Sequence, residues 1–123
     1  MRKILIVDDK ADVRQLVRVT LEMEEVEFLE ADSGVQGLAL AQAELPHLII
    51  LDVMMPGALD GFQVCEQLKR DLSTKAIVII LLTARGQDAD RKRAQEVGAN
   101  AHLIKPFSPR ELLDVVYSVF ENK

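Results

Sequence analysis

Five side chains in this sequence could carry out phosphoryl chemistry if one fold brings them together: Asp8, Asp9, Asp52, Thr83 and Lys105. All stand at or just after the end of a short apolar run. Carboxylates that share a crevice repel one another, and a divalent cation with oxygen ligands relieves that repulsion. Mg²⁺ fits best, because one or two carboxylates usually hold it together with waters and phosphate oxygens. Mn²⁺ suits the same ligands and is the expected substitute.

Asp52 is the best candidate for a nucleophile, because its strand lies at the centre of the arrangement predicted below. A carboxylate nucleophile would form an aspartyl phosphate. Asp8 and Asp9 would then hold the metal, while the Lys105 ammonium group and the Thr83 hydroxyl would contact phosphoryl oxygens.

The apolar runs predict the strands that position these residues. Runs at 4–7, 48–51 and 76–82 are almost continuously apolar, as in strands that are covered on both faces of a parallel sheet. A shorter run lies at 101–104, and a run at 26–31 that includes two glutamates indicates an edge strand. Helical patterns separate the runs, so we expect five βα units with helices on both faces of the sheet. Ligands bind beyond the carboxyl ends of such strands.

The fourth predicted helix, residues 88–97, has a weak apolar face. Ala89, Ala94 and Val97 would form its inner side. Three cations in the same helix, residues 91–93, are most simply a solvated face. Gly98 follows as a candidate helix end.

Composition limits the class of protein. The 123 residues fit one domain over 1–123, and fifteen basic against twenty acidic residues give a net charge of −5. That balance disfavours binding to nucleic acid or to an anionic membrane. Cys65 is the single cysteine, which excludes an intrachain disulfide, and no run approaches the roughly 18 apolar residues of a membrane span. We expect an unprocessed cytoplasmic protein.

Four motifs in order resemble the receiver domain of two-component response regulators. They are Val7-Asp8-Asp9, Leu51-Asp52-Val53-Met54-Met55-Pro56-Gly57, Leu82-Thr83-Ala84 and Lys105-Pro106-Phe107. The resemblance covers essentially the whole chain. It implies a flavodoxin-like (βα)5 fold with strand order 2-1-3-4-5. It also implies that a histidine kinase or a phosphotransfer protein donates a phosphoryl group to Asp52 and that the domain then switches its binding to partners.

The resemblance also implies the roles of single residues. Asp9 resembles a direct metal ligand, Asp8 a ligand that acts largely through water, and the Met54 carbonyl a third ligand. Thr83 resembles the switch hydroxyl. Lys105 resembles the lysine that senses the phosphoryl group.

The segment around Lys105 completes the implied switch. The bond from Lys105 to Pro106 is cis in the family. Downstream proteins in the family commonly dock on the fourth helix, fifth strand and fifth helix, and a homodimer formed on phosphorylation is a further partner that the resemblance allows.

Two features depart from the family pattern. The family commonly has seven residues from the acceptor to the Asp-Gly pair that opens the third helix, whereas Asp52 and Asp60 are eight apart here. His102 stands at the second switch position, where an aromatic ring is frequent. Its imidazole is smaller and titratable, so the readout could depend on pH.

Other interpretations of the same residues stay open. Asp8 and Asp9 could simply cap the first helix. A magnesium-dependent phosphatase would need a second acid near its nucleophile, but Met54 stands two residues after Asp52. A flavin binder or a phosphorylation-independent interaction module could use the same fold. The chain could also be a receiver fragment of a longer regulator with an output domain.

Overall fold

The computed structural model describes residues 2–23, 25–84 and 88–121. Five strands alternate with five helices along the chain. The elements are β1 (Arg2–Val7), α1 (Ala11–Leu21), β2 (Val26–Ala31), α2 (Gly34–Glu44), β3 (Leu48–Asp52), α3 (Gly61–Arg70), β4 (Val78–Thr83), α4 (Asp88–Glu96), β5 (Ala101–Ile104) and α5 (Pro109–Glu121). The five predicted strands are confirmed, although the fourth begins at Val78, two residues later than the apolar run.

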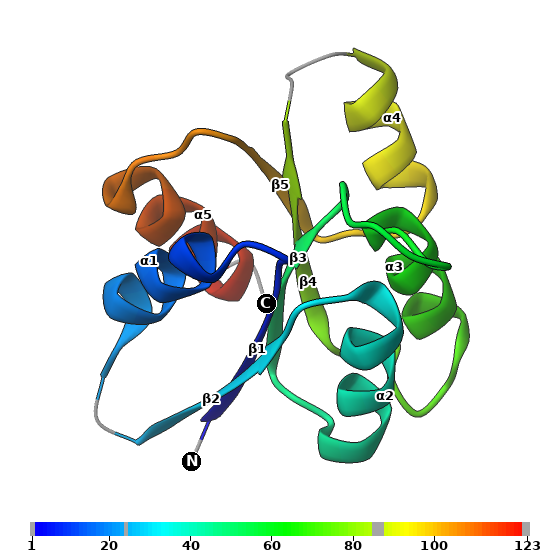
Figure 1. Ribbon diagram of the computed structural model, residues 1–123, viewed down its shortest axis with the longest axis horizontal. Coiled ribbons are helices and arrows are strands. Elements are labelled where there is room, and N and C mark those ends of the chain that lie inside the picture. Colours follow the sequence, from blue (N-terminus) through cyan, green and yellow to red (C-terminus); the bar gives the residue numbers. More distant parts are fainter. Residues whose placement is uncertain (1, 24, 85–87, 122–123) are drawn as a thin grey trace.

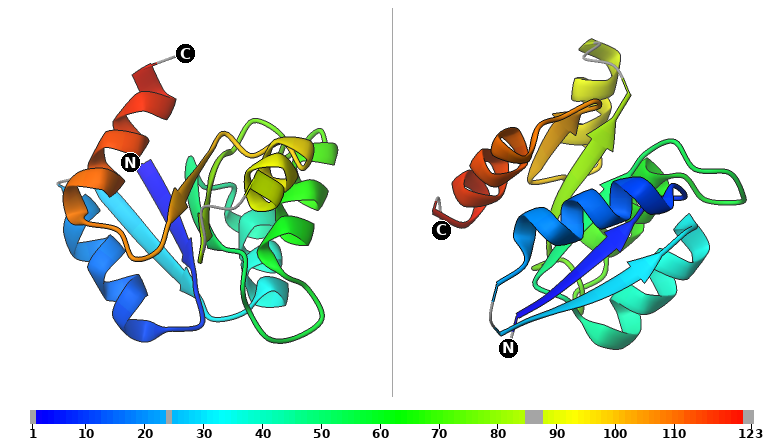
Figure 2. Two further views of the ribbon diagram at one scale, coloured as in Figure 1. Left: turned by 90° about the horizontal axis from the view of Figure 1, so that it is seen from above. Right: turned by 60° about the vertical axis from the view of Figure 1, so that its left-hand side comes forward.

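All the strands pair in parallel in one sheet of order β2-β1-β3-β4-β5. The predicted flavodoxin-like order is therefore confirmed, with β2 at an edge. Helices α1 and α5 cover one face of the sheet, and α2, α3 and α4 cover the other (Figures 1 and 2). Because all the strands are parallel, the carboxyl ends of β1, β3, β4 and β5 lie side by side at the same end of the sheet.

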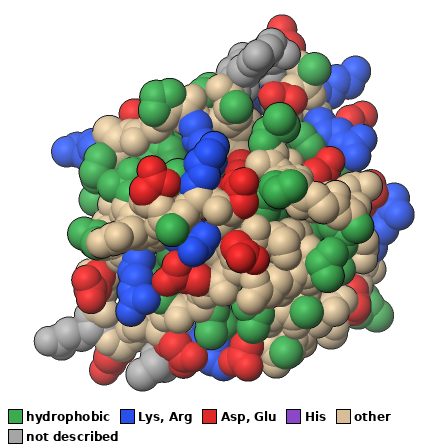
Figure 3. Space-filling model, viewed as in Figure 1, with side chains coloured by type: hydrophobic (Ala, Val, Ile, Leu, Met, Phe, Trp, Pro, Cys, Tyr) green, Lys and Arg blue, Asp and Glu red, His purple; other side chains and the backbone are tan. Residues whose placement is uncertain are grey.

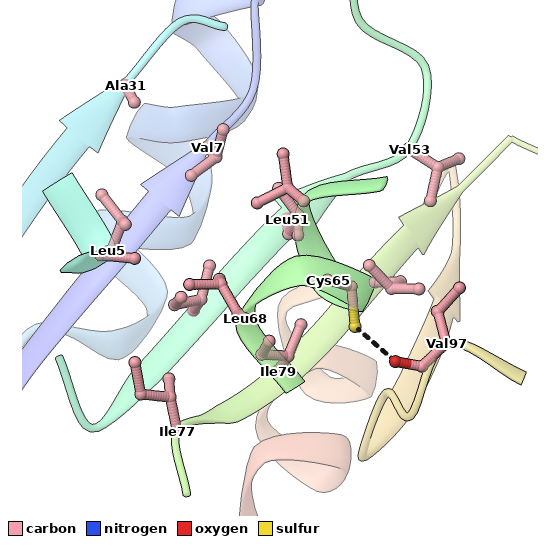
Figure 4. Close-up of a cluster of buried hydrophobic side chains, with 14 of the residues drawn as sticks. Leu5, Val7, Ala31, Leu51, Val53, Cys65, Leu68, Ile77, Ile79 and Val97 are labelled. Carbon is pink, nitrogen blue, oxygen red and sulfur yellow. Dashed lines mark hydrogen bonds between the residues drawn. The ribbon is translucent and has the colours of Figure 1, made fainter. Parts of the chain in front are cut away.

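Two buried clusters, one on each face of the sheet, hold these layers together. The first lies under α2, α3 and α4, where Leu5, Leu51 and Ile79 pack against Cys65 and Leu68 (Figure 4). The second lies under α1 and α5, with residues such as Ile6, Ile50 and Leu82 facing Val17 and Leu112. Alternate residues of each central strand thus enter opposite clusters, which explains the continuous apolar runs.

Side-chain caps fix where three of the helices begin. The Ser33 hydroxyl accepts a hydrogen bond from the Gln36 backbone N–H at the start of α2. Asp60 and Gln63 form a reciprocal capping box at α3. Ser108 and Glu111 form another at α5, where the Glu111 backbone N–H donates to the Ser108 hydroxyl and the Glu111 carboxylate accepts from the Ser108 N–H.

Helix α4 packs more lightly than predicted. Ala94 and Val97 are buried, but Ala89 is exposed, so the expectation that Ala89 lies on the inner side was wrong. Gly98, with φ of 85°, ends this segment as expected. The helix therefore rests on the domain mainly through its last turn.

The surface carries mixed charges. Figure 3 shows acidic and basic side chains interspersed over one face, with apolar side chains between them. Within residues 2–23, 25–84 and 88–121, no helix is both long and apolar enough to cross a membrane.

Candidate functional site

The carboxyl ends of β1 and β3 bring three predicted acids together. Oxygen atoms of Asp8, Asp9 and Asp52 all lie within 4.8 Å of one another. Asp8 and Asp52 are buried, while Asp9 is exposed. A buried pair of carboxylates with a third at the rim is a donor set suited to a hard divalent cation.

Asp52, the last residue of β3, is 2% exposed. Its Oδ1 accepts a hydrogen bond of 3.2 Å from the Met54 backbone N–H and lies 3.4 Å from Lys105 Nζ. Its Oδ2 is buried and has no hydrogen-bond partner among residues 2–23, 25–84 and 88–121. Burying a carboxylate oxygen without a hydrogen-bond partner costs free energy, so Oδ2 is the atom of Asp52 at which we expect a ligand to bind.

Asp8 is fully buried and held at several atoms. Its Oδ1 accepts from the Lys10 backbone N–H at 2.9 Å, and its Oδ2 accepts from Lys105 Nζ at 2.7 Å. Lys10 is the N-cap residue of α1 and makes no side-chain cap. The cap of α1 is thus Lys10 rather than Asp8 or Asp9.

Thr83 ends β4 on the other side of Asp52. It is fully buried, and its hydroxyl is the other buried side-chain polar atom without a partner in the described part of the chain. The Thr83 carbonyl accepts a 2.7 Å hydrogen bond from the Lys105 backbone N–H. Two unpartnered oxygens, one a hydroxyl and one a carboxylate, therefore occupy neighbouring strand ends.

The electrostatics of the site follow from this burial. Desolvation, reinforced by the negative charge of Asp8, raises the pKa of Asp52, although Lys105 opposes the shift. Desolvation tends to lower the pKa of Lys105, but its hydrogen bond to Asp8 and the charges of Asp52 and Asp8 outweigh it and leave the pKa raised. Lys105 thus stays charged between two carboxylates.

The chain matches the family model described as the response regulator receiver domain over residues 4–117. The chain belongs to the response regulator receiver domain family. Such domains accept a phosphoryl group in two-component signalling, and this chain is one of them. The family generally binds Mg²⁺ at an acidic pocket, and the three acids with their unpartnered oxygen fit that ion.

Curated relatives of this receiver domain are transcriptional regulators. The chain is 46% identical over 112 residues to the phosphate regulon transcriptional regulatory protein PhoB of Pseudomonas aeruginosa, covering 91% of this chain and 48% of that protein. It is 44% identical over 111 residues to the transcriptional regulatory protein ResD of Bacillus subtilis, covering 90% and 45%. The chain thus spans about half the length of the curated relatives it matches.

Solved structures agree with the receiver fold. The chemotaxis response regulator CheY4 of Vibrio cholerae is 34% identical with a TM-score of 0.88, and the match covers 97% of this chain and 98% of that one. The Thermotoga maritima OmpR/PhoB homologue DrrB is 30% identical with a TM-score of 0.86, and the match covers 99% of this chain but 54% of that one.

The structure brings five of the predicted residues together at the carboxyl ends of the strands: Asp8, Asp9, Asp52, Thr83 and Lys105. The other predicted residues lie around this group. His102 lies half-buried on β5, and Met54 is 70% exposed. The Lys105–Pro106 peptide is cis, as the resemblance implied. Sequence reasoning missed Arg14, which donates to the Asp8 backbone carbonyl at 2.8 Å.

The longer loop after Asp52 packs against α2. A Cβ atom on Gly34 would lie 2.3 Å from the Leu59 carbonyl oxygen. Gly34 therefore allows a close backbone approach that seats the loop beside the site.

Proposed function

We propose that Asp52 is the phosphoacceptor of this receiver domain and that Mg²⁺ binds to Asp8, Asp9, Asp52 and the Met54 backbone carbonyl. The observation that carries the proposal is the buried, unpartnered Asp52 Oδ2, which lies within a cluster of three carboxylates and beside a lysine. Mn²⁺ would take the same ligands. When bound, the cation would offset the charge of the oxygens around the transferred group.

In this proposal each residue has one task in the transfer. The Asp52 carboxylate attacks the phosphorus of a phosphohistidine in line, and the bond from phosphorus to the imidazole nitrogen breaks. Lys105, already 3.4 Å from Asp52 Oδ1, pairs with a phosphoryl oxygen. The Thr83 hydroxyl donates to another oxygen, which gives it the partner that it lacks.

The same contacts would form the switch. Phosphorylation adds about −1.5 to −2 charge, which draws Thr83 and Lys105 toward the phosphoryl oxygens. Lys105 and Pro106 follow β5 directly, and His102 lies within that strand. The pull would therefore bias an existing equilibrium at the face formed by α4, β5 and α5, where we expect the downstream protein or a second copy of the domain to bind.

The phosphodonor is a histidine kinase or a phosphotransfer protein. A groove of about 400 Å³ lies beside the acceptor between α1 and the segment after β5, and its lining is mainly apolar. Val13, Leu16, Pro106 and Phe107 line it, together with Lys105. Because Lys105 also contacts Asp52, a donor helix docked here would hold its phosphohistidine close to the acceptor.

The proposal also covers the wider protein. The domain itself would catalyse only its own phosphorylation and dephosphorylation and would act in the cytoplasm without contacting nucleic acid. In a longer regulator, an output domain would act in transcriptional regulation, the role that the names of the curated relatives give.

Intact mass measured after incubation with Mg²⁺ and acetyl phosphate tests the acceptor. We expect one added phosphate, which is lost with EDTA and absent from Asp52→Asn. Asp32→Asn, at an exposed acid after β2, is the matched control and should be phosphorylated normally. If the wild type carries no phosphate although it binds Mg²⁺, the domain is a phosphorylation-independent interaction module; steady turnover of a phosphomonoester would instead indicate a phosphatase.

Lys105→Ala separates phosphorylation from the switch. The variant should still be phosphorylated on Asp52. On phosphorylation, however, the NMR signals of its β5 and α4 amides should shift less than those of wild type, because the variant has no ammonium group to follow the phosphoryl oxygens. The free energy that couples phosphorylation of Asp52 to the change at β5 and α4, about 1–3 kcal/mol, would be lost. Full wild-type shifts in this variant would contradict the role of Lys105.

A further inference from the structure

Arg14 on α1 joins the acidic site to the edge strand of the sheet. Its Nη1 donates to the Asp8 backbone carbonyl at 2.8 Å, and its Nε donates to Glu30 Oε1 on β2 at 2.9 Å. The Arg14 side chain is only 19% exposed. A planar guanidinium group with two anchored donors is a rigid bridge, unlike a solvated arginine.

The contact to Asp8 completes the set of bonds around that residue. The Asp8 backbone N–H donates to the Ala31 carbonyl, and its two carboxylate oxygens accept from Lys10 and Lys105. Its carbonyl oxygen accepts from Arg14. Every polar atom of Asp8 is thus held from a different direction.

The Asp8 carbonyl belongs to the peptide that leads into Asp9. Asp9 is exposed at the rim of the carboxylate cluster, so buried packing does not fix its side chain. The direction in which its carboxylate enters the cluster therefore depends on the orientation of this peptide, which Arg14 holds. Groups that orient metal ligands from behind typically change metal affinity by about 10–100-fold when they are lost.

We propose that Arg14 is a positioning residue, held by Glu30, that orients the Asp8–Asp9 peptide and thereby sets the affinity of the site for Mg²⁺. The inference rests on the Mg²⁺ site of the proposed function. It adds a residue outside the acidic cluster, on the face of a helix, whose role is to orient the cluster through the backbone.

Charge alone predicts the opposite effect. Arg14 is a cation near a cation site, so its removal should strengthen Mg²⁺ binding if only electrostatics mattered. Arg18 is the matched control, because it lies one turn further along α1 and pairs with the same Glu30 at 3.3 Å, with no bond to Asp8. Arg18→Ala removes the same charge and leaves the Asp8 peptide held.

The experiment is an Mg²⁺ titration of the whole chain, followed by amide NMR signals, with urea unfolding in EDTA measured in parallel. We expect Arg14→Ala to raise the dissociation constant by about tenfold or more. Arg18→Ala should stay within about twofold of wild type or bind more tightly. Arg14→Lys keeps the charge but cannot bridge both partners, so it should fall between wild type and Arg14→Ala.

Glu30 provides the second arm of the test. Glu30→Ala should weaken Mg²⁺ binding in the same direction as Arg14→Ala, and the double variant should bind no more weakly than Arg14→Ala alone, because Glu30 acts through Arg14. If Arg14→Ala does not fold, Arg14→Lys decides the question, because it keeps the charge and removes the bridge.

Three different results would overturn the proposal. If Arg14→Ala and Arg18→Ala bind Mg²⁺ equally, Arg14 does not position the site, although the site itself stands. If wild type binds no Mg²⁺, both the proposed metal site and this role of Arg14 fail. A loss of unfolding free energy with unchanged Mg²⁺ affinity would assign Arg14 a purely structural role and also overturns the proposal.

Discussion

Strands β3 and β4 are buried at every residue, whereas in β5 only Leu103 is buried. The helix beside β5, α4, buries Ala94 alone within its bounds, while α3 buries four of its residues. The centre of the sheet and the flank formed by α4 and β5 thus have the same architecture but different packing. Regions with few buried contacts open at a lower free energy than a core does.

The candidate site lies on the border between these two regions. Asp52 and Thr83 end central strands, while Lys105 follows β5 and bonds to the Thr83 carbonyl. A charge added at Asp52 therefore lies between the tightly packed central strands on one side and the lightly packed flank of α4 and β5 on the other. The flank is where such a change can produce movement at low cost.

The strongest test of this contrast uses two neighbouring leucines. Leu82 and Leu103 are register partners on β4 and β5 and belong to the same cluster. Substitution of a buried leucine by alanine costs about 2.7–5 kcal/mol, depending on how far the site can relax. We expect Leu82→Ala to lie near the upper end of that range and Leu103→Ala near the lower end, as measured by urea unfolding.

Equal losses for the two variants would contradict the contrast, because they would mean that β5 is as constrained as β4. Leu113→Ala, at a partly exposed residue of α5, is the baseline for a leucine that contributes little. It should cost less than either strand variant.

A smaller effect should appear at the site itself, with the opposite sign. Burial and the charge of Asp8 raise the pKa of Asp52, so the ionised carboxylate destabilises the metal-free fold at neutral pH. Asp52→Asn should therefore increase the free energy of unfolding in EDTA, by about 1.4 kcal/mol for each unit by which the pKa is raised. Urea unfolding at pH 7 measures the difference.

The pH dependence gives the control. The folded pKa of Asp52 lies above its ordinary value of 3.8, so its contribution to stability is fully present below that value and is lost as pH rises through the folded pKa. The gap between Asp52→Asn and wild type should open over that interval and stay constant above it. Added Mg²⁺ should narrow the gap; an unchanged gap would mean that the cation does not contact Asp52.

Much of the fold follows from the sequence because each central strand is an uninterrupted apolar run that ends in a polar residue. In a parallel sheet all these ends meet, so Asp8, Asp52 and Thr83 could be placed together without knowing any side-chain contact. The edge strand β2 was recognisable by Glu27 and Glu30, which interrupt its apolar residues; in the structure Glu27 is half-buried and Glu30 is exposed.

The remaining features depend on distances between elements, which no local pattern encodes. Arg14 has the spacing of a solvated helical cation, yet its partners lie on β2 and in the loop after β1. Gly34 looks like an ordinary residue at the start of a helix, yet the Leu59 carbonyl occupies the space that a side chain would need. Ala89 fits the apolar stripe of α4, but the helix does not approach the sheet closely there.

The smallest effect concerns Cys65, which links α3 to the end of the α4 segment. Its thiol donates a 3.6 Å hydrogen bond to the Val97 carbonyl (Figure 4), and burial raises the pKa of Cys65 to about 12. The unfolded chain ionises near the ordinary value of 9.0. The stability that the protonated thiol provides is therefore fully present below pH 9 and declines as pH rises toward 12.

Comparison with Cys65→Ala isolates this ionisation, because the packing loss of the variant does not change with pH. Between pH 7 and pH 10, the unfolding free energy of wild type should fall by about 1.4 kcal/mol more than that of Cys65→Ala. Parallel pH profiles for the two proteins would mean that the thiol ionises as easily in the folded chain as in the unfolded one. The contact between Cys65 and Val97 would then be open to water. The lightly packed flank would in that case include α3 as well as α4 and β5.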